Sequence, residues 1–134
     1  MIAARDDQDQ QSQPLSDPAL LLDSVGSGIY ALDAGGRCTF INATAASALG
    51  YRADEAVGKD MHELVHHSRE DGSAYPVPDC PILQSLHSGR SSKVDGEVFW
   101  RKDGRCFPVT YTCRPMTRGG AVKGAVVTFN DAVE

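Results

Sequence analysis

The chain has 134 residues, of which 41% are hydrophobic, and this length and composition fit a single domain with one core. Its net charge of −5, with Lys and Arg scattered along the chain, argues against a nucleic-acid-binding surface. The chain has no apolar run of about 18 residues, and its polar N-terminus lacks the apolar core of a signal peptide. We therefore expect a cytoplasmic domain without a membrane segment.

The N-terminal part divides into a polar leader and a short helix. Residues 1–16 are rich in Asp, Gln and Ser, which predicts a disordered leader. A helix is predicted over residues 17–26, and Ser16 or Asp17 is suited to cap it. Pro18 is compatible with this start, since proline is tolerated in the first turn of a helix. This helix has an apolar side between Leu20 and Val25.

A hairpin is predicted next, followed by short helices. Strands at residues 28–33 and 37–42 flank an Ala-Gly-Gly turn, which is a strong hairpin signal. Asn42 is placed to cap a helix over residues 43–49, which Gly50 would end. Further helical turns are expected at residues 53–57 and 60–66.

The C-terminal half is predicted to contain a loop, a helix and three strands. The loop covers residues 68–79, and the helix runs from Pro81 to Ser88 and ends at Gly89. The strands are expected at residues 94–102, 106–116 and 121–129, joined by tight turns. Tight turns imply antiparallel pairing, so the expected fold class is α+β, a five-stranded antiparallel sheet with short helices on one face.

Three stretches of this sequence together resemble the PAS family over residues 17–132. They are GIYALD with GRCTFIN and ALGY at residues 28–51, WRKDGRCFPV at 100–109, and GAVVTFND at 124–131. The resemblance implies a PAS-like fold for residues 17–134, with a pocket between the concave face of the sheet and the helices. It also implies a non-catalytic sensor domain that acts in signal transduction.

The same resemblance sets the expected partners. The output domain would be a histidine kinase of a two-component system, a cyclic-dinucleotide enzyme, a phosphatase or a regulator of transcription, and none is expected within this chain. Family members often pair through a helix before the first strand, so the helix at 17–26 predicts a homodimer. The bound partner would be a small ligand or cofactor, or another protein; neither nucleic acid nor membrane is expected.

One stretch has the pattern of a zinc hydrolase. His62-Glu63-Leu64-Val65-His66 is H-E-x-x-H, in which two imidazoles on one helix face hold zinc beside a general-base Glu. No later Gly and third His extend the pattern, and no helix is evident to supply a distant ligand. We therefore expect no metal site here, with a zinc hydrolase or adventitious binding by His62, His66 and His67 as alternatives.

The helix at 81–88 holds the strongest cofactor candidates. Cys80, Leu83 and His87 share a stripe. By resemblance this helix lines the pocket, and some haem-binding PAS domains take their axial His from it, which makes His87 a haem-ligand candidate for gas or redox sensing. The alternative is a hydrated His at the helix end. About 10 Å of helix axis separates Cys80 from His87, so one metal cannot bind both.

A second hypothesis for Cys80 is that it belongs to a flavin-binding site. The stretch Cys80-Pro-Ile-Leu-Gln is similar to the photoactive cysteine motif of light-sensing PAS proteins, but Asp79 and Pro81 depart from that motif. The alternative is a small apolar residue near a helix start, and we expect the same of Cys38, Cys106 and Cys113, which form no CxxC pair. The cofactor stays open between haem, flavin and none.

Residues on the strands are expected to face the pocket. In the strand at 106–116, apolar residues alternate with polar ones, which predicts one buried and one wet face. The same residues would equally build a hydrophobic core. The predicted pocket-facing residues are Phe40, Asn42, Val98, Trp100, Phe107, Val109, Tyr111 and Cys113.

Overall fold

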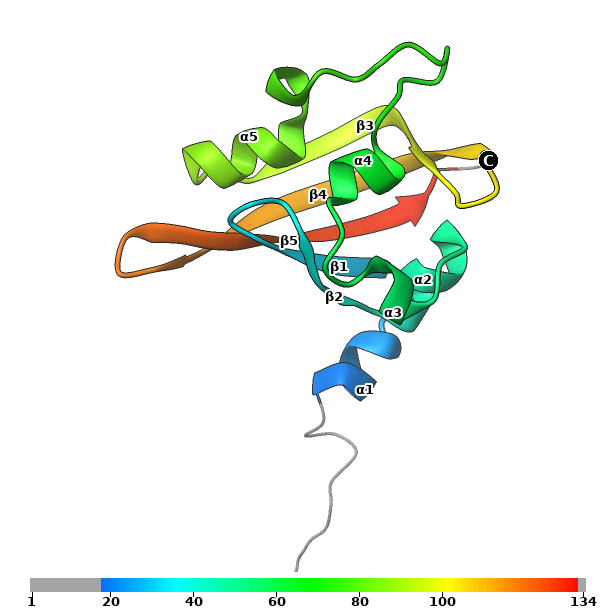
Figure 1. Cartoon of the computed structure of the whole chain (residues 1–134). Coiled ribbons are helices and arrows are strands. Elements are labelled where there is room, and N and C mark those ends of the chain that lie inside the picture. Colours follow the sequence, from blue (N-terminus) through cyan, green and yellow to red (C-terminus); the bar gives the residue numbers. More distant parts are fainter. Residues whose placement is uncertain (1–17, 133–134) are drawn as a thin grey trace, which may run out of the picture.

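The computed structural model describes residues 18–132, which form an antiparallel five-stranded sheet in the order β2-β1-β5-β4-β3 (Figure 1). This confirms the predicted fold class. The expected leader at residues 1–16 lies outside the described residues. The strands are β1 (Gly28–Asp33), β2 (Cys38–Ile41), β3 (Ser92–Trp100), β4 (Cys106–Arg118) and β5 (Ala121–Asp131).

The helices are short, and α4 and α5 lie across one face of the sheet (Figure 1). Among the described residues, no helix is long and apolar enough to cross a membrane. The first helix is shorter than predicted and ends at Asp23. The helical elements are α1 (Pro18–Asp23), α2 (Ala43–Leu49), α3 (Ala53–Ala56), α4 (Met61–Val65), the 3₁₀ turn η2 (Val77–Asp79) and α5 (Pro81–Ser88).

Local signals in the sequence set the boundaries of α2 and α5. The Asn42 side chain accepts a hydrogen bond from the Ala45 amide at 2.9 Å, and Gly50 ends α2 in the left-handed conformation. Pro81 begins α5, where its missing N–H has no helical partner to lose, and Gly89 ends it at φ 74°. Both predicted helices are confirmed.

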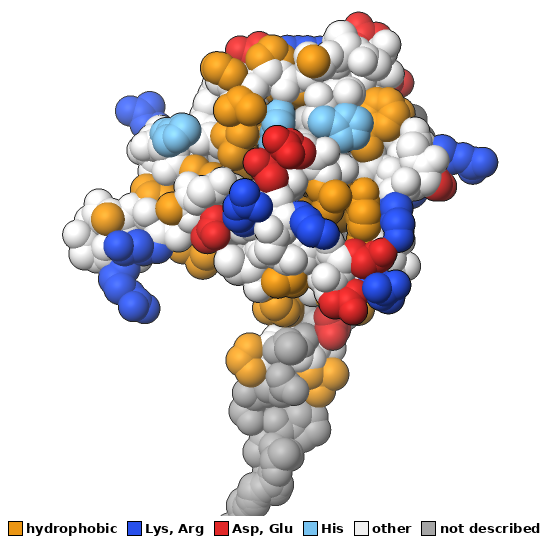
Figure 2. Space-filling model, in the orientation of Figure 1, with side chains coloured by type: hydrophobic (Ala, Val, Ile, Leu, Met, Phe, Trp, Pro, Cys, Tyr) orange, Lys and Arg blue, Asp and Glu red, His pale blue; other side chains and the backbone are white. Residues whose placement is uncertain are grey.

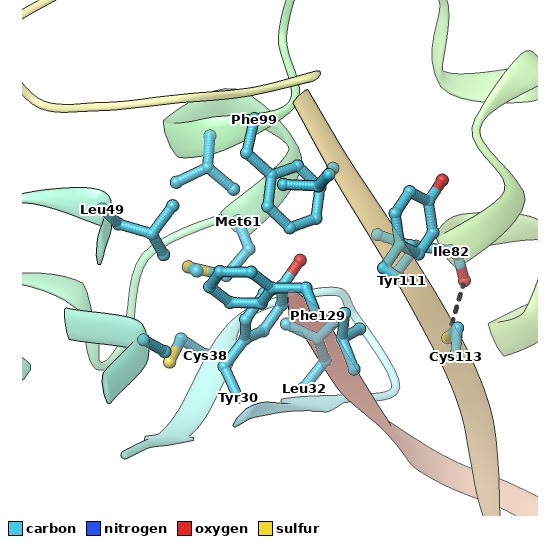
Figure 3. Close-up of a cluster of buried hydrophobic side chains, with 14 of the residues drawn as sticks. Tyr30, Leu32, Cys38, Leu49, Met61, Ile82, Phe99, Tyr111, Cys113 and Phe129 are labelled. Carbon is cyan, nitrogen blue, oxygen red and sulfur yellow. Dashed lines mark hydrogen bonds between the residues drawn. The ribbon is translucent and has the colours of Figure 1, made fainter. Parts of the chain in front are cut away.

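The core lies between the inner face of the sheet and the helices, and Figure 3 shows its main side chains. On β4, Phe107, Val109, Tyr111 and Cys113 are buried while Pro108 between them is exposed, as the alternation predicted. Aromatic rings fill the centre, with Phe99 stacked on Tyr111 at 5.4 Å between centroids.

Two β-bulges make part of the predicted inner face wrong. Between Ala31 and Leu32 the pairing with β2 shifts by one residue, so Phe40 lies opposite Ala31 on the outer face. Between Val94 and Glu97 the pairing of β3 with β4 shifts in the same way. Strict alternation from Val94 would turn Val98 and Trp100 inward; the bulge instead turns Glu97 and Phe99 inward.

Candidate functional site

A group of polar side chains lies buried between α4, α5 and the sheet, centred on the carboxylate of Glu97. Its Oε1 accepts hydrogen bonds from His66 Nε2 and from the Tyr111 hydroxyl, both at 2.8 Å. Its Oε2 accepts one from the Tyr75 hydroxyl at 2.7 Å. We call the six polar residues of this region the Glu97 cluster: Glu97, His66, Tyr75, Tyr111, Cys80 and His62.

The two remaining members extend the cluster towards the helices. Nδ1 of His66 lies 3.3 Å from the Cys80 sulfur. Nε2 of His62 donates to the carbonyl oxygen of Tyr75 at 2.8 Å. His66 and Cys80 are each 1% exposed and His62 is 8% exposed, so the cluster is largely sealed from water.

Local structure aims each of these side chains. Gly96 takes a φ of 83° in the β3 bulge, a conformation that glycine adopts without a Cβ penalty, and Glu97 follows it facing inward. Asp60 caps α4 by accepting from the Glu63 amide, which orients the helix that carries His62. Cys80 is the N-cap residue of α5 and points towards α4.

Charge is held inside the cluster by mutual hydrogen bonding. Burial alone would raise the pKa of Glu97, but hydrogen bonds from His66, Tyr75 and Tyr111 lower it to about 2. Burial alone would lower the pKa of His66, but its bonds to Cys80 and Glu97 raise it to about 9. At neutral pH the cluster therefore contains an ion pair between the partly exposed Glu97 carboxylate and the buried His66 imidazolium.

The interior offers little space for a large cofactor. The cavity between Tyr30, Met61, His62, His66 and Cys80 measures about 10 Å³, near the smallest space that holds one water molecule. Aromatic rings and aliphatic side chains occupy the rest of the volume between sheet and helices. Haem or flavin does not fit this interior without displacing several of these rings.

Helix α5 does not present His87 to the interior, which corrects the haem-ligand prediction. The buried face of α5 is formed by Ile82, Ser85 and Leu86. His87 follows Leu86, so the turn of the helix directs its side chain away from the buried face. It is exposed and borders surface hollows. Of the predicted stripe, Cys80 is fully buried and the half-buried Leu83 borders the small cavity.

Two other predicted pocket residues have structural partners. Asn42 is buried, and its side chain accepts from the Ile29 and Ala45 amides and donates to the Leu22 and Ser27 carbonyls. Its hydrogen-bonding capacity is therefore used by the backbone. Trp100 lies outside the core, where its indole donates to the Ser68 carbonyl at 2.8 Å and its ring stacks on His67.

The H-E-x-x-H stretch does not assemble a hydrolase site. His62 and His66 face the interior, but Glu63 is exposed on the outside of α4. A general base has to reach a metal-bound water on the same side as the two imidazoles. The structure therefore places the two histidines, which could bind a metal, on a different side of the helix from Glu63, which would have to act as the general base.

A surface pocket of about 320 Å³ lies against the outside of Glu97. We call it the outer pocket; it is lined by Ser68, Arg69, Glu70, Asp71, Tyr75, Gly96, Glu97 and Val98. The Glu97 side chain is 21% exposed, so the same carboxylate borders the pocket and anchors the buried cluster. Three acidic residues and a single basic residue line this pocket.

Sequence reasoning missed Glu97 and Tyr75 as site residues. Glu97 was a charged residue inside a predicted strand, and Tyr75 lay in a predicted loop. The available signal was Gly96 directly before Glu97, because glycine within a strand often marks a bulge that re-aims a side chain.

Comparison with protein families places these features among known domains. A family model described as PAS fold matches residues 16–132. The probable diguanylate cyclase DgcE of Escherichia coli K12 is 25% identical over 119 residues, which cover 86% of this chain. The chain spans about 10% of the length of that relative.

Solved structures agree in fold. The PAS domain of nitrogen regulation protein NR(II) from Vibrio parahaemolyticus matches with a TM-score of 0.66 and 23% identity, covering 87% of this chain and 98% of that one. The PAS domain of the fruit-fly ELK potassium channel matches with a TM-score of 0.68 and 16% identity, covering 92% and 100%. At these identities the likeness concerns the fold alone.

Proposed function

This chain belongs to the PAS family, a family of sensory domains that are generally non-catalytic, and we propose that it binds a small ligand and regulates an output domain. The observation that carries this proposal is Glu97, a single carboxylate shared between the outer pocket and the buried cluster. A ligand that contacts Glu97 from outside acts directly on the hydrogen bonds that join α4 to the sheet.

The chemistry of the outer pocket favours a small cationic ligand. Glu70, Asp71 and Glu97 give it an acidic lining. Arg69 also lines the pocket, but its guanidinium is already engaged, because it pairs with Asp79 at 3.2 Å and lies over the Tyr75 ring. A volume of about 320 Å³ suits a compact amine or guanidine.

The ligand signal would be transmitted because the ligand competes with His66 and Tyr75 for hydrogen bonds to Glu97. A ligand amine that donates a hydrogen bond to this carboxylate weakens the bonds that the carboxylate accepts from His66 or Tyr75. β3 pairs with β4 and β4 with β5, so a change at Glu97 reaches the last strand through the sheet. The ligand shifts the domain between two states only by its difference in affinity for them.

The single tryptophan provides the test. Trp100 donates to the carbonyl of Ser68, a residue of the outer pocket, so its fluorescence should report ligand entry. We expect saturable changes on titration with agmatine or putrescine and none with succinate, which carries the opposite charge.

Charge-reversal variants identify the pocket. Glu70→Lys should abolish the amine response, whereas Glu63→Lys, an exposed acid on α4 outside the outer pocket, should retain it. A response that is equal in both variants, or absent from a broad panel of amines and guanidines, would argue against a cationic ligand here.

The expected partners and location extend the proposal. Hydrophobic side chains are exposed on and just after α1, at the lower end of the described residues in Figure 1 and Figure 2, and we assign this surface to pairing with a second copy. A kinase, cyclic-dinucleotide enzyme, phosphatase or transcription regulator would read the signal. The four free cysteines suit the reducing cytoplasm.

A further inference from the structure

The fold brings Cys80 to the two histidines of the H-E-x-x-H stretch. One imidazole nitrogen of His62, one of His66 and the Cys80 sulfur all lie within 4.8 Å of one another. In a tetrahedral zinc site, bonds of about 2.0–2.3 Å place neighbouring ligand atoms about 3.3–3.8 Å apart. The His66 to Cys80 distance of 3.3 Å already matches, so mainly the His62 ring has to close in.

In both His62 and His66, Nε2 is used in a hydrogen bond, which leaves Nδ1 as the nitrogen that could bind a metal. The Tyr75 carbonyl only accepts, so His62 Nε2 carries the proton and neutral His62 keeps a lone pair on Nδ1. The Glu97 carboxylate likewise only accepts, so His66 keeps its proton on Nε2 and turns Nδ1 towards Cys80. A carbonyl or carboxylate behind each imidazole is the arrangement that orients metal-binding histidines.

His62 carries an unexplained polar atom. Its side chain is more than nine-tenths buried, and Nδ1 has no hydrogen-bond partner among residues 18–132. A buried acceptor without a partner costs about 1–3 kcal/mol, so such atoms are rare without a ligand or water. The 10 Å³ cavity beside His62, His66 and Cys80 adjoins this atom's ring.

We propose that His62, His66 and Cys80 form a buried binding site for one transition-metal ion of the zinc type. Two imidazoles and a thiolate suit Zn²⁺ or Co²⁺ rather than Mg²⁺ or Ca²⁺, which prefer oxygen ligands. Because His66 is protonated at neutral pH, metal binding releases its Nδ1 proton, together with the thiol proton when Cys80 carries one. The small cavity lined by these three residues is the space available to the ion, and its volume is close to the smallest that holds one water molecule.

This site can be tested separately from the proposed amine response, although Glu97 touches both sites through its hydrogen bond to His66. The metal site uses the inner side of the Glu97 cluster, whereas the outer pocket uses the surface side of Glu97. A chain that takes up no metal would remain a PAS sensory domain, and a metal-binding chain without an amine response would lose only the outer-pocket proposal. Each proposal can therefore be contradicted without affecting the other.

The test is a titration of the reduced, chelator-treated protein with Co²⁺ as the probe. We expect a thiolate-to-cobalt charge-transfer band in the near-ultraviolet and visible d–d bands that saturate at one ion per chain. Zn²⁺ should bleach both sets of bands. Cys80→Ser should remove the charge-transfer band, and His62→Gln should weaken affinity beyond the roughly 10–100-fold typical of outer-shell partners.

Matched controls use residues of the same type outside the site. Cys106→Ser and His87→Gln should bind Co²⁺ as the wild type does, because neither residue borders the cavity. Circular dichroism checks that each variant is folded. If Cys80→Ser does not fold, alkylation of the wild type decides: Zn²⁺ should slow modification of Cys80 but not of Cys106. Absence of a one-to-one cobalt spectrum in folded wild-type protein, or equal alkylation rates with and without Zn²⁺, would overturn the proposal.

Discussion

At the residue scale, Glu97 shows how one charged side chain organises a small interior. It holds His66, Tyr75 and Tyr111, three donors from three different parts of the chain. Buried polar networks stabilise strongly when every member has a partner and weaken sharply when one is removed. Glu97 is therefore a structural anchor as well as a border of the outer pocket.

We expect Glu97→Gln to destabilise the domain by about 1–3 kcal/mol, because the amide cannot accept all the hydrogen bonds that the carboxylate accepts from His66, Tyr75 and Tyr111. Urea unfolding followed by circular dichroism measures the change. The exposed Glu63→Gln should stay within about 0.5 kcal/mol of the wild type. A loss for Glu97→Gln no larger than that of the control would contradict the anchoring role.

A surface ion pair predicts a pH effect. Hydrogen bonds from Lys102 and from the Arg52 amide lower the pKa of Glu55 from 4.5 to about 2. Because the pKa is lower in the folded state, the stabilisation is full above pH 4.5 and is lost as pH falls towards 2. Glu55→Gln should therefore be less stable than the wild type at neutral pH, and the difference should vanish in acid. Paired urea titrations at both pH values measure it; a constant difference would show that the charge is not responsible.

At the scale of elements, β-bulges determine which residues enter the interior. The bulge in β2 turns Phe40 outward and the bulge in β3 turns Glu97 inward. Each changes the phase of a strand by one residue, and every later side chain changes face. The spacing between neighbouring strands also restricts which residues fit. The backbone of β5 packs tightly against β1 at Gly124, which leaves no room there for a side chain.

We expect Gly124→Ala to destabilise the domain by about 1–3 kcal/mol, because the added Cβ would collide with the Leu32 carbonyl of β1. Backbone in a paired strand cannot move away without weakening the ladder. Gly35→Ala is the matched control, since its Cβ would meet only the Asp33 carboxylate at an ordinary 3.4 Å. Thermal unfolding compares the two, and equal midpoints would contradict the collision.

At the scale of the whole molecule, charge and exposed apolar surface suggest where partners bind. On the face shown in Figure 2, basic and acidic side chains are interspersed, without a basic stripe. Leu21 and Val25 are 43% and 55% exposed at the α1 end, away from the outer pocket. Pairing at this end would leave the ligand pocket accessible in both copies.

The double variant Leu21→Glu with Val25→Glu should convert a dimer into monomers, because charge on an apolar contact is costly to bury. Sedimentation velocity measures the mass. Val57→Glu, which changes an equally exposed apolar residue on the α3 side, should leave the mass unchanged. A wild-type monomer, or a double variant that stays dimeric, would remove α1 from the dimer.

The sequence by itself determined the features that depend on neighbours along the chain. Asn42 with Gly50, Pro81 with Gly89, and the alternation from Phe107 to Cys113 predicted helix ends and an inner strand face that the structure confirms. Capping and turn formation are local hydrogen-bonding problems, so a few residues suffice to solve them. The order of these elements then indicated the fold.

Only the tertiary structure decided which side chains meet. Register shifts in β2 and β3 depend on the partner strand, so Phe40, Val98 and Trp100 were assigned to the wrong face. The rotation of α5 depends on its packing against the sheet, which exposes His87 and buries Cys80 beside His66. Hydrogen bonds between residues 13 to 31 positions apart assemble the Glu97 cluster, and no local pattern encodes such separations along the chain.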